Sequence, residues 1–499
     1  MTSAGNNDAQ GSATGPSSPA RYHPAPCLPA LTRRIVLGAA ITSLTSLTPF
    51  TAHADLNLVP GMTPAEASAA AGTQLVYETL LNKSSTTTLT PDEQSLFEET
   101  RQLVQTSNEQ QGSGPTQFSL GLTEEGLRKA LQWVAAEELT TPGTMATKTT
   151  SGQLTSVAAR LTALKLGATG FHMSMQDNGF PDTALAMNRH DPRGGGGASA
   201  DSVSGIDFSK LGGFVNGSLG FGTKDPTTRE DAFDYGNSNL TFGADYRVTD
   251  KAVFGAALGY TEYEADFNST KSVTDGSVKS SAFTGSVYGL YDMAPFSLDG
   301  ILSLGGNSFD IVRHIKYPSN NPGVPPTNEV AYGSTDSFQY AFSFGGGYEG
   351  HRKALTYSGL AHLNYLHADI SGYTETNAHA FNLQLQDQSV TSVTTSFGGQ
   401  ASYAFSKSFG VLVPEGSLLW YHEFSNDSRN VQARYVADPL ASNYLSAPTD
   451  NPTRDYFSLG VGMSAVFQGG IMAFLHYETL IGLNSITSHL FTGGVRLEF

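Results

Sequence analysis

At roughly 150 residues per domain, a chain of 499 residues suggests two or three units, although a single barrel can take about 250 or more. The 28 lysines and arginines against 45 aspartates and glutamates give a formal charge of −17, which argues against nucleic acid as a partner because phosphate binding needs a basic face. The single cysteine, Cys27, excludes an internal disulfide framework and a cysteine-built zinc site. Apart from a short apolar stretch near the start, no run approaches the roughly 20 apolar residues of a spanning helix, which excludes a helical membrane protein and leaves a β-barrel open.

The first predicted element is a secretory signal over residues 1–54, with an extended N-region. Two arginines at 33–34 precede an apolar stretch at 35–47, and a small-residue A-x-A exit follows it. The residues that define the expected cleavage site are Ala52, Ala54 and Asp55. The alternative is a buried core helix. Residues 1–32 are either an extended leader or an upstream misassigned start, and the general export route is favoured over the twin-arginine route because the rest of that motif is missing.

Residues 55–169 are predicted to form a small, mainly helical segment. Two capping boxes with proline at the first helical position, at 63–66 and 90–93, predict helix starts. Apolar residues with helical spacing at 127–135 and 154–164 predict two more helices. Such a segment is either a small bundle or a set of helices that order only against another part of the chain. A linker over 170–207 follows, with four consecutive glycines at 194–197 as its most flexible point.

From residue 208 to 499 the apolar period changes from 3.6 to 2. In strand after strand one face is apolar with aromatic residues and the other is polar or very small, as expected where lipid lies outside a filled or wet lumen. We predict twelve antiparallel strands, and hence a transmembrane β-barrel preceded by the helical segment. The strands are expected at roughly 212–224, 236–248, 251–266, 276–292, 295–313, 334–349, 354–369, 387–404, 408–425, 454–467, 470–481 and 487–499.

The lengths of the connections support the barrel more strongly than any single strand does. After even-numbered strands the connections are tight, as at Thr249-Asp250 and Met293-Ala294, whereas after odd-numbered strands they are mostly long and polar, as at 314–333 and 426–453. Outer-membrane barrels have short periplasmic turns and longer outer loops, and a soluble sandwich has no physical reason to separate loop lengths in this way. The connection at 482–486 is shorter than this rule predicts.

A leader, a short N-terminal segment, a linker and a C-terminal barrel together resemble an autotransporter of the type V secretion route. The resemblance covers roughly 208–499. It depends on the opening Leu211-Gly212-Gly213-Phe214-Val215-Asn216-Gly217, on the strand at 240–248 and on the closing Gly493-Gly494-Val495-Arg496-Leu497-Glu498-Phe499. It implies a twelve-stranded barrel in the outer membrane, with the N-terminal segment as a passenger at the cell surface. The passenger departs from the usual pattern, because it is short and helical rather than a long β-solenoid.

The resemblance also implies partners and residue roles. The partners are outer-membrane lipid, the secretion translocon and the barrel-assembly machinery, which recognises the last strand. The residues expected to form that assembly signal are Val495, Leu497 and Phe499. A helix upstream of the first strand passes through the pore in this family, and both 152–167 and a stretch near 198–210 are candidates.

Four charged residues are predicted to face the lumen: Asp245, Arg247, Arg496 and Glu498. They are either selectivity charges of a pore or lining groups that pair with each other or with a plug helix, and the second interpretation is favoured because lumen charges are normal in barrels. The sequence has no G-x-S-x-G, GDSL, H-E-x-x-H, Walker or EF-hand motif. His362 and His367 are five residues apart on a strand, which places them on opposite faces and argues against a metal pair.

The prediction is therefore an outer-membrane autotransporter that anchors and helps translocate a short helical passenger, without catalytic activity, metal or cofactor. One alternative is an outer-membrane diffusion channel with a periplasmic helical domain that is never exported. A less favoured alternative is a surface hydrolase, which the missing motifs argue against.

Overall fold

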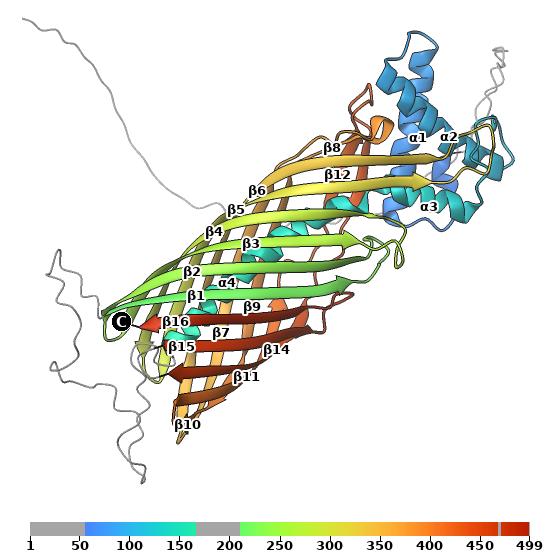
Figure 1. The fold of residues 1–499 in the computed structure, drawn as a ribbon. Helices are drawn as coiled ribbons and strands as arrows, with labels where there is room; N and C mark the ends of the chain where they lie inside the picture. The colour runs from blue at the N-terminus through green and yellow to red at the C-terminus, as the bar shows by residue number, and fades with distance from the viewer. Residues whose placement is uncertain (1–54, 166–209, 468–470, 499) are drawn as a thin grey trace, which may run out of the picture. The chain divides into compact units, whose positions relative to one another are not determined.

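The computed structural model describes residues 55–165, 210–467 and 471–498 (Figure 1). The predicted signal with Ala52 and Ala54, the predicted linker at 170–207, and Phe499 lie outside the described residues. Within the described residues, no helix is both long enough and apolar enough to cross a membrane.

The N-terminal part consists of helices, and the starts of the first two long ones agree with the predicted capping boxes, whereas the last helix, predicted from apolar spacing at 154–164, begins much earlier, at Thr141. In chain order they are η1 (Leu56–Leu58), α1 (Pro64–Ser84), α2 (Pro91–Gln110), α3 (Glu124–Ala135), η2 (Glu137–Thr140) and α4 (Thr141–Lys165). Thr63 and Thr90 close complete capping boxes at the N-termini of α1 and α2, each with proline in the first turn. These boxes satisfy backbone N–H groups that would otherwise have no partner at a helix start.

The C-terminal part is built almost entirely of antiparallel strands. The twelve long ones are β1 (Leu211–Lys224), β2 (Phe233–Thr249), β3 (Ala252–Phe267), β4 (Gly276–Met293), β5 (Phe296–Tyr317), β6 (Thr327–Arg352), β7 (Leu355–Ile370), β9 (Gln388–Tyr403), β11 (Gly410–Glu423), β14 (Asp455–Phe467), β15 (Ile471–Ile481) and β16 (His489–Glu498). Four short strands, β8 (Leu383–Leu385), β10 (Phe405–Lys407), β12 (Asn430–Tyr435) and β13 (Tyr444–Pro448), and the short helix η4 (His379–Phe381) lie between them.

The long strands form a closed barrel. Each pairs with its neighbours in sequence order, β11 joins β9 to β14, and β1 pairs with both β2 and β16, so the first and last strands complete the ring. β10 extends β9 after a single residue and pairs only with β11. The prediction of a twelve-stranded antiparallel barrel is confirmed. Closure leaves no strand edge unpaired, which a wall in contact with hydrocarbon requires.

The two faces of the wall differ as the period-2 pattern predicts. Outward side chains are large and apolar, and Leu258 and Phe283 are each 71% exposed. Inward neighbours on the same strands, such as Ala257 and Thr284, are small and buried. This alternation leaves a lumen wide enough to take a helix, while the outer wall offers apolar surface.

The connections separate the two ends of the barrel. At one end, the short-turn end, the hairpins β2–β3, β4–β5 and β6–β7 turn within two residues, at 250–251, 294–295 and 353–354. At the other, the long-loop end, connections such as 268–275 and 318–326 are longer, and β8, β12 and β13 form a separate three-stranded sheet there.

Strands β5 and β6 continue several residues further toward the long-loop end than the sequence pattern indicated. The predicted strands were 295–313 and 334–349, whereas β5 extends to Tyr317 and β6 begins at Thr327. The additional residues hold α2, because the hydroxyls of Tyr317 and Thr327 donate to Oε2 of Glu99 at 3.2 and 2.8 Å. The alternation of apolar and polar residues ends where the wall no longer contacts lipid. The alternation therefore did not predict these additional strand residues.

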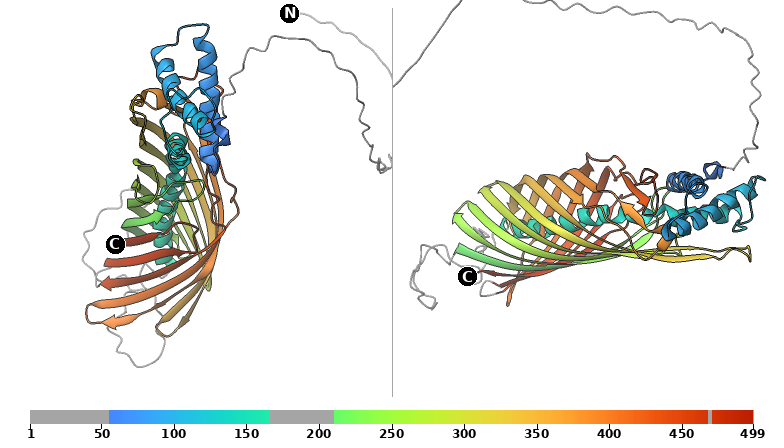
Figure 2. Two further views of the ribbon diagram at one scale, coloured as in Figure 1. Left: turned by 90° about the vertical axis from the view of Figure 1, so that its right-hand side faces the viewer. Right: turned by 90° about the horizontal axis from the view of Figure 1, so that it is seen from above.

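Helices α1, α2 and α3, called here the cap helices, pack on the long-loop end (Figures 1 and 2). α1 lies against β13, α2 against η4 and α3 against β5. One hydrophobic core joins the cap residues Leu80 and Leu103 to Tyr317, Phe381 and Tyr435 of the barrel strands and loops. The cap helices and the loops therefore form one packed unit.

Candidate functional site: the plugged lumen

α4 occupies the barrel lumen from the long-loop end to the short-turn end (Figure 2). It begins at Thr141, directly after the cap, and contacts the inner face of strands β1 to β7 and β9. Its 25 residues extend about 37 Å at about 1.5 Å per residue, which exceeds the roughly 30 Å hydrocarbon core of a bilayer. Of the two pore-helix candidates from the sequence, the one at 152–167 overlaps α4, and the one near 198–210 lies almost entirely outside the described residues.

An apolar stripe on α4 fixes the helix against one side of the wall. Val157, Leu161 and Leu164 are buried in a cluster with Phe214 and Tyr288 of the barrel. These positions have the i, i+4, i+7 spacing of one helix face. The stripe orients α4, so that its polar residues meet defined partners on the strands.

A buried, bidentate ion pair joins α4 to β2. Nε and Nη2 of Arg160 donate to the two carboxylate oxygens of Asp245 at 2.6 and 2.8 Å, and the two side chains are 0% and 1% exposed. The hydroxyl of Tyr288 donates to the same carboxylate at 3.0 Å, and the Arg160 guanidinium lies over the ring of Phe214. Gly212 is required beside the pair, because a Cβ there would lie 2.6 Å from Nη2 of Arg160.

A second ion pair lies at the short-turn end of the helix. Nζ of Lys165 lies 2.5 Å from Oδ2 of Asp299 on β5, and Nε2 of His362 on β7 lies 2.9 Å from the other oxygen. His367 contacts Thr391 and Asp369 instead, so the two histidines do not share a site.

Neutral hydrogen bonds join the middle of α4 to the wall. Oγ of Ser156 donates to Oδ1 of Asn239 at 3.0 Å, and Asn216 donates to the Ser156 carbonyl at 3.1 Å. Thr241 donates to Oε1 of Gln153 at 3.1 Å. At Gly259 the helix approaches so closely that a Cβ would lie 2.0 Å from Oε1 of Gln153.

The four predicted lumen charges have different surroundings. Asp245 pairs with Arg160, as described. Nη2 of Arg496 donates to the carbonyl of Ala159 on α4 at 3.2 Å. Arg247 lies at a short turn and donates to the carbonyl of Asp250 at 3.1 Å, while for Glu498 the structure describes only the backbone, which pairs with Gly212.

The predicted assembly residues lie on β16. Val495 pairs with Val215 and Ala473 and is 45% exposed on the outer wall. Leu497 pairs through its backbone with Gly213 and Ile471, and its side chain is outside the described residues.

The sequence reasoning missed the helix partners of the lumen charges, Arg160 and Lys165, together with Asp299. A signal was present in the spacing of Gln153, Ser156 and Arg160, which at i, i+3 and i+7 form a polar face beside the apolar stripe. A polar face on a helix normally faces solvent. This polar face predicts contacts with the barrel wall only if the helix is already expected to lie inside the barrel.

The lumen beside α4 retains a polar cavity of about 800 Å³. It lies between α4 and the inner wall from β7 through β9, β11 and β14 to β15, and its lining includes Lys148, Tyr421, His476 and Glu478. Among the described residues, no group of three or more histidine, cysteine, aspartate or glutamate side chains is placed to hold a metal ion.

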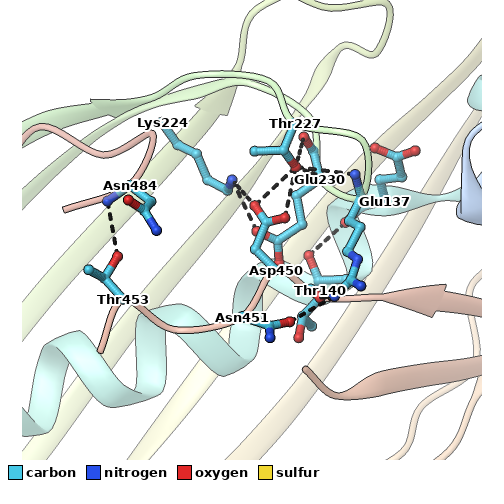
Figure 3. A network of polar contacts seen from close by, with 11 residues as sticks. Glu137, Thr140, Lys224, Thr227, Glu230, Asp450, Asn451, Thr453 and Asn484 are labelled. Carbon is cyan, nitrogen blue, oxygen red and sulfur yellow. Dashed lines mark hydrogen bonds and ion pairs between the residues drawn. The ribbon is translucent and has the colours of Figure 1, made fainter. Parts of the chain in front are cut away.

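A polar network at the long-loop end contributes to the lining of this cavity (Figure 3). Lys224 at the end of β1 binds Glu230 at 3.1 Å and Asp450 at 2.7 Å. Thr227 also donates to Asp450, and Arg229 donates to Asn451 at 2.8 Å. The network joins the β1–β2 loop to the segment that precedes β14.

Comparison with known proteins is consistent with this architecture. A family model described as the autotransporter beta-domain matches residues 213–478. A similar solved structure is the translocator domain of autotransporter NalP from Neisseria meningitidis, which is 16% identical over 59% of this chain and 90% of that chain, with a TM-score of 0.46.

Two further solved structures are similar. The beta domain of the Bordetella autotransporter BrkA is 16% identical over 58% of this chain and 100% of that chain, with a TM-score of 0.41. The Pseudomonas putida toluene transporter TodX is 10% identical over 57% of this chain and 88% of that chain, with a TM-score of 0.34. No curated protein matches the chain in sequence.

Proposed function

The chain belongs to the autotransporter family, and from that premise we propose that its barrel carried the cap helices through the lumen and now anchors them at the cell surface, with α4 as the plug. The barrel is an outer-membrane translocator domain, and such a barrel is not catalytic in itself. In this proposal the cap helices are a passenger that remains attached and has no enzymatic activity.

One observation carries the proposal: the chain direction through the lumen. The cap precedes α4 and lies at the long-loop end, whereas Lys165 and the start of β1 at Leu211 both lie at the short-turn end. In outer-membrane barrels short turns face the periplasm and long loops face outward. An N-terminal segment delivered to the periplasm reaches the outer end by passing through the lumen, and α4 marks that path.

Contacts between the cap and the loops support retention of the passenger. The backbone N–H of Ser446 donates to Oγ of Ser68 at 2.6 Å, and the hydroxyls of Thr73 and Tyr435 lie 3.0 Å apart in a buried contact. Asn320 donates to the carbonyl of Gly121 at 3.1 Å. A passenger with its own independent fold would not need to share a core with the loops.

Protease accessibility on intact cells tests the topology. An epitope with a protease site is inserted in the exposed α1–α2 connection after Thr87, and a matched control carries the same insert in the short turn at Asp250. The proposal predicts that the first insert is cleaved on intact cells and that the second is cleaved only after the outer membrane is permeabilised. A cap insert that stays protected on intact cells contradicts the proposal.

The assembly signal is also part of the proposal. β16 closes the barrel by pairing with β1 and β15, and Val495 presents an apolar side chain to the outside. We expect Val495→Asp to lower the amount of folded barrel in the outer membrane, because a charge on the lipid face is unfavourable and the last strand is the proposed recognition element. Thr492→Asp, at an inward position of the same strand, is the control for a general effect of charge.

The polar cavity beside α4 favours one second candidate, a diffusion channel. In that case the full-length protein conducts ions steadily in a planar bilayer. A barrel that is blocked when full-length and conducts after removal of α4 supports the plugged translocator instead.

A further inference from the structure

The joint between the cap and the plug is the short turn η2. α3 ends at Ala135. The next residue, Ala136, lies in the left-handed region with φ of 54° and ψ of 50°, and η2 then redirects the chain into α4. An alanine rarely adopts this conformation. The packing around η2 therefore holds the cap helices in one orientation relative to α4. If that packing is lost, the cap helices can move relative to α4.

Glu138 in this turn is buried with little to compensate its charge. Its side chain is 0% exposed, and neither carboxylate oxygen accepts a hydrogen bond from another described residue. Its own backbone N–H and the charge of Arg313 favour the ionised form, but less than burial opposes it. The cation that faces it is Arg313 of β5, but that guanidinium already makes two hydrogen bonds to Glu375, at 3.0 and 2.6 Å. Tyr373 also faces Glu138 from the β7–β8 connection. A carboxyl group in such a place favours its protonated, neutral form.

Glu137 lies beside it and faces other carboxyl groups. It is 3% exposed, and the charged groups around it are Glu66 of α1 together with Glu230 and Asp231 of the β1–β2 loop. Asp231 accepts hydrogen bonds from Thr274 at 2.6 Å and from Gln132 of α3 at 2.7 Å.

Lys224 does not neutralise Glu137, because it is already paired with two other carboxylates. Lys224 binds Glu230 and Asp450, whose carboxyl groups lie next to each other (Figure 3). Arg128 faces Glu66, and Arg429 faces Glu230. Even with these cations, negative charge would exceed positive charge if Glu137 and Glu138, which are 3% and 0% exposed, ionised together with the other carboxyl groups near η2. The joint can remain packed only while some of these groups hold a proton.

We propose that η2 is an acid-closed latch: the cap helices stay docked while Glu137 and Glu138 are protonated, and they undock from the loops as these two groups ionise, while the barrel remains folded. Undocking brings both carboxylates to water, which removes the penalty of burying their charge. The latch is independent of which side of the membrane the cap faces, so its test does not depend on the proposed topology.

The expected protonation of the two groups agrees with this proposal. Burial raises the pKa of Glu138 to about 8, against the opposing effect of Arg313. Burial, with the charges of Asp231 and Glu138, raises the pKa of Glu137 well above its usual range. The docked state therefore binds more protons than the undocked state, whose carboxyl groups titrate at ordinary values. Docking is strongest at acid pH and weakens by about tenfold in its equilibrium constant per pH unit for each proton released.

A buried cysteine probe reports undocking directly. Thr73 is 0% exposed at the contact of α1 with Tyr435, so a Thr73→Cys thiol in a Cys27→Ser background reacts with a maleimide only when the cap opens. Ser85→Cys, at the exposed end of α1, gives the reference rate and corrects for the intrinsic pH dependence of thiol reactivity.

The latch predicts that the ratio of the two labelling rates rises by about tenfold or more between pH 5 and pH 8 in the folded, full-length protein. In Glu137→Gln/Glu138→Gln the probe stays protected and the ratio changes less than about twofold, because neither group can ionise. Glu124→Gln/Glu125→Gln, which removes two exposed carboxylates from the start of α3, is the matched control and keeps the wild-type profile.

Two outcomes overturn the latch. One is a flat wild-type ratio from pH 5 to pH 9, which refutes it without any glutamate variant. The other is a rise that persists in the double glutamine variant, which would place the titrating groups elsewhere. Barrel integrity is followed in the same samples by the mobility difference between heated and unheated protein on a gel, so that global unfolding is not mistaken for undocking.

Discussion

Removal of the charge on Asp245 is expected to release the plug. Asp245→Asn keeps the size of the side chain but leaves the Arg160 guanidinium without its charged partner. Both side chains are almost completely buried, and the two hydrogen bonds at 2.6 and 2.8 Å are lost or weakened together. Breaking one partner of a buried pair costs about 3–5 kcal/mol, which corresponds to a shift of roughly 10²- to 4 × 10³-fold toward the state with α4 outside its site.

Ion conductance of single barrels in a planar bilayer measures this shift. Full-length wild-type protein is expected to be closed for most of the recording, and Asp245→Asn is expected to open far more often. Asp250→Asn, an exposed aspartate in a short turn on the same hairpin, is the control and should behave as wild type.

A double substitution separates the effect of the pair from that of damage to the site. Arg160→Met with Asp245→Leu replaces the ion pair by apolar groups of similar size, which is often neutral or stabilising. This variant should therefore stay closed. The reasoning is refuted if Asp245→Asn conducts no more than wild type, or if the double variant opens as often as the single one.

Three further predictions follow from the same contacts. Gly259→Leu should displace α4 at its middle and raise conductance, because even a Cβ would lie 2.0 Å from Oε1 of Gln153. Lys165→Met should open the plug less often than Asp245→Asn does in the same recordings, because Lys165 is 13% exposed and its partner Asp299 keeps His362. Thr63→Ala should lower the stability of the cap by about 1 kcal/mol through loss of an N-cap, measured as faster proteolysis within α1 while the barrel stays resistant.

Much of the barrel could be predicted because lipid imposes a simple rule on every strand. Outward residues such as Leu258 and Phe283 must be apolar, so the period-2 signal is present wherever the wall meets hydrocarbon. Loop length then separates the two ends without any further information. The capping boxes at Thr63 and Thr90 are equally local, and they give the helix starts to the residue.

The rest depended on contacts between distant segments. The ends of β5 and β6 face the cap rather than lipid. Tyr317 and Thr327 therefore donate hydrogen bonds to Glu99 on α2 and do not follow the alternation that lipid imposes. Arg160 is 85 residues from Asp245 in sequence, and neither residue alone indicates the other. The pairing is determined by the position of α4 in the lumen. The amphipathic pattern of the helix does not predict that position.

Disulfide trapping of α4 inside the barrel tests the central claim most directly. Ser156→Cys on α4 and Asn239→Cys on β2 replace two side chains whose Oγ and Oδ1 atoms lie 3.0 Å apart. A protease site placed between residues 166 and 209 separates the helix from the barrel after oxidation. The account predicts that the two fragments of protein taken from the outer membrane stay joined until a reductant is added. The control pair Ser156→Cys and Leu240→Cys, whose second residue points to the outer wall, should not cross-link. Fragments that separate without reductant in the first pair, or cross-linking of equal yield in the control, would contradict a helix held in the lumen.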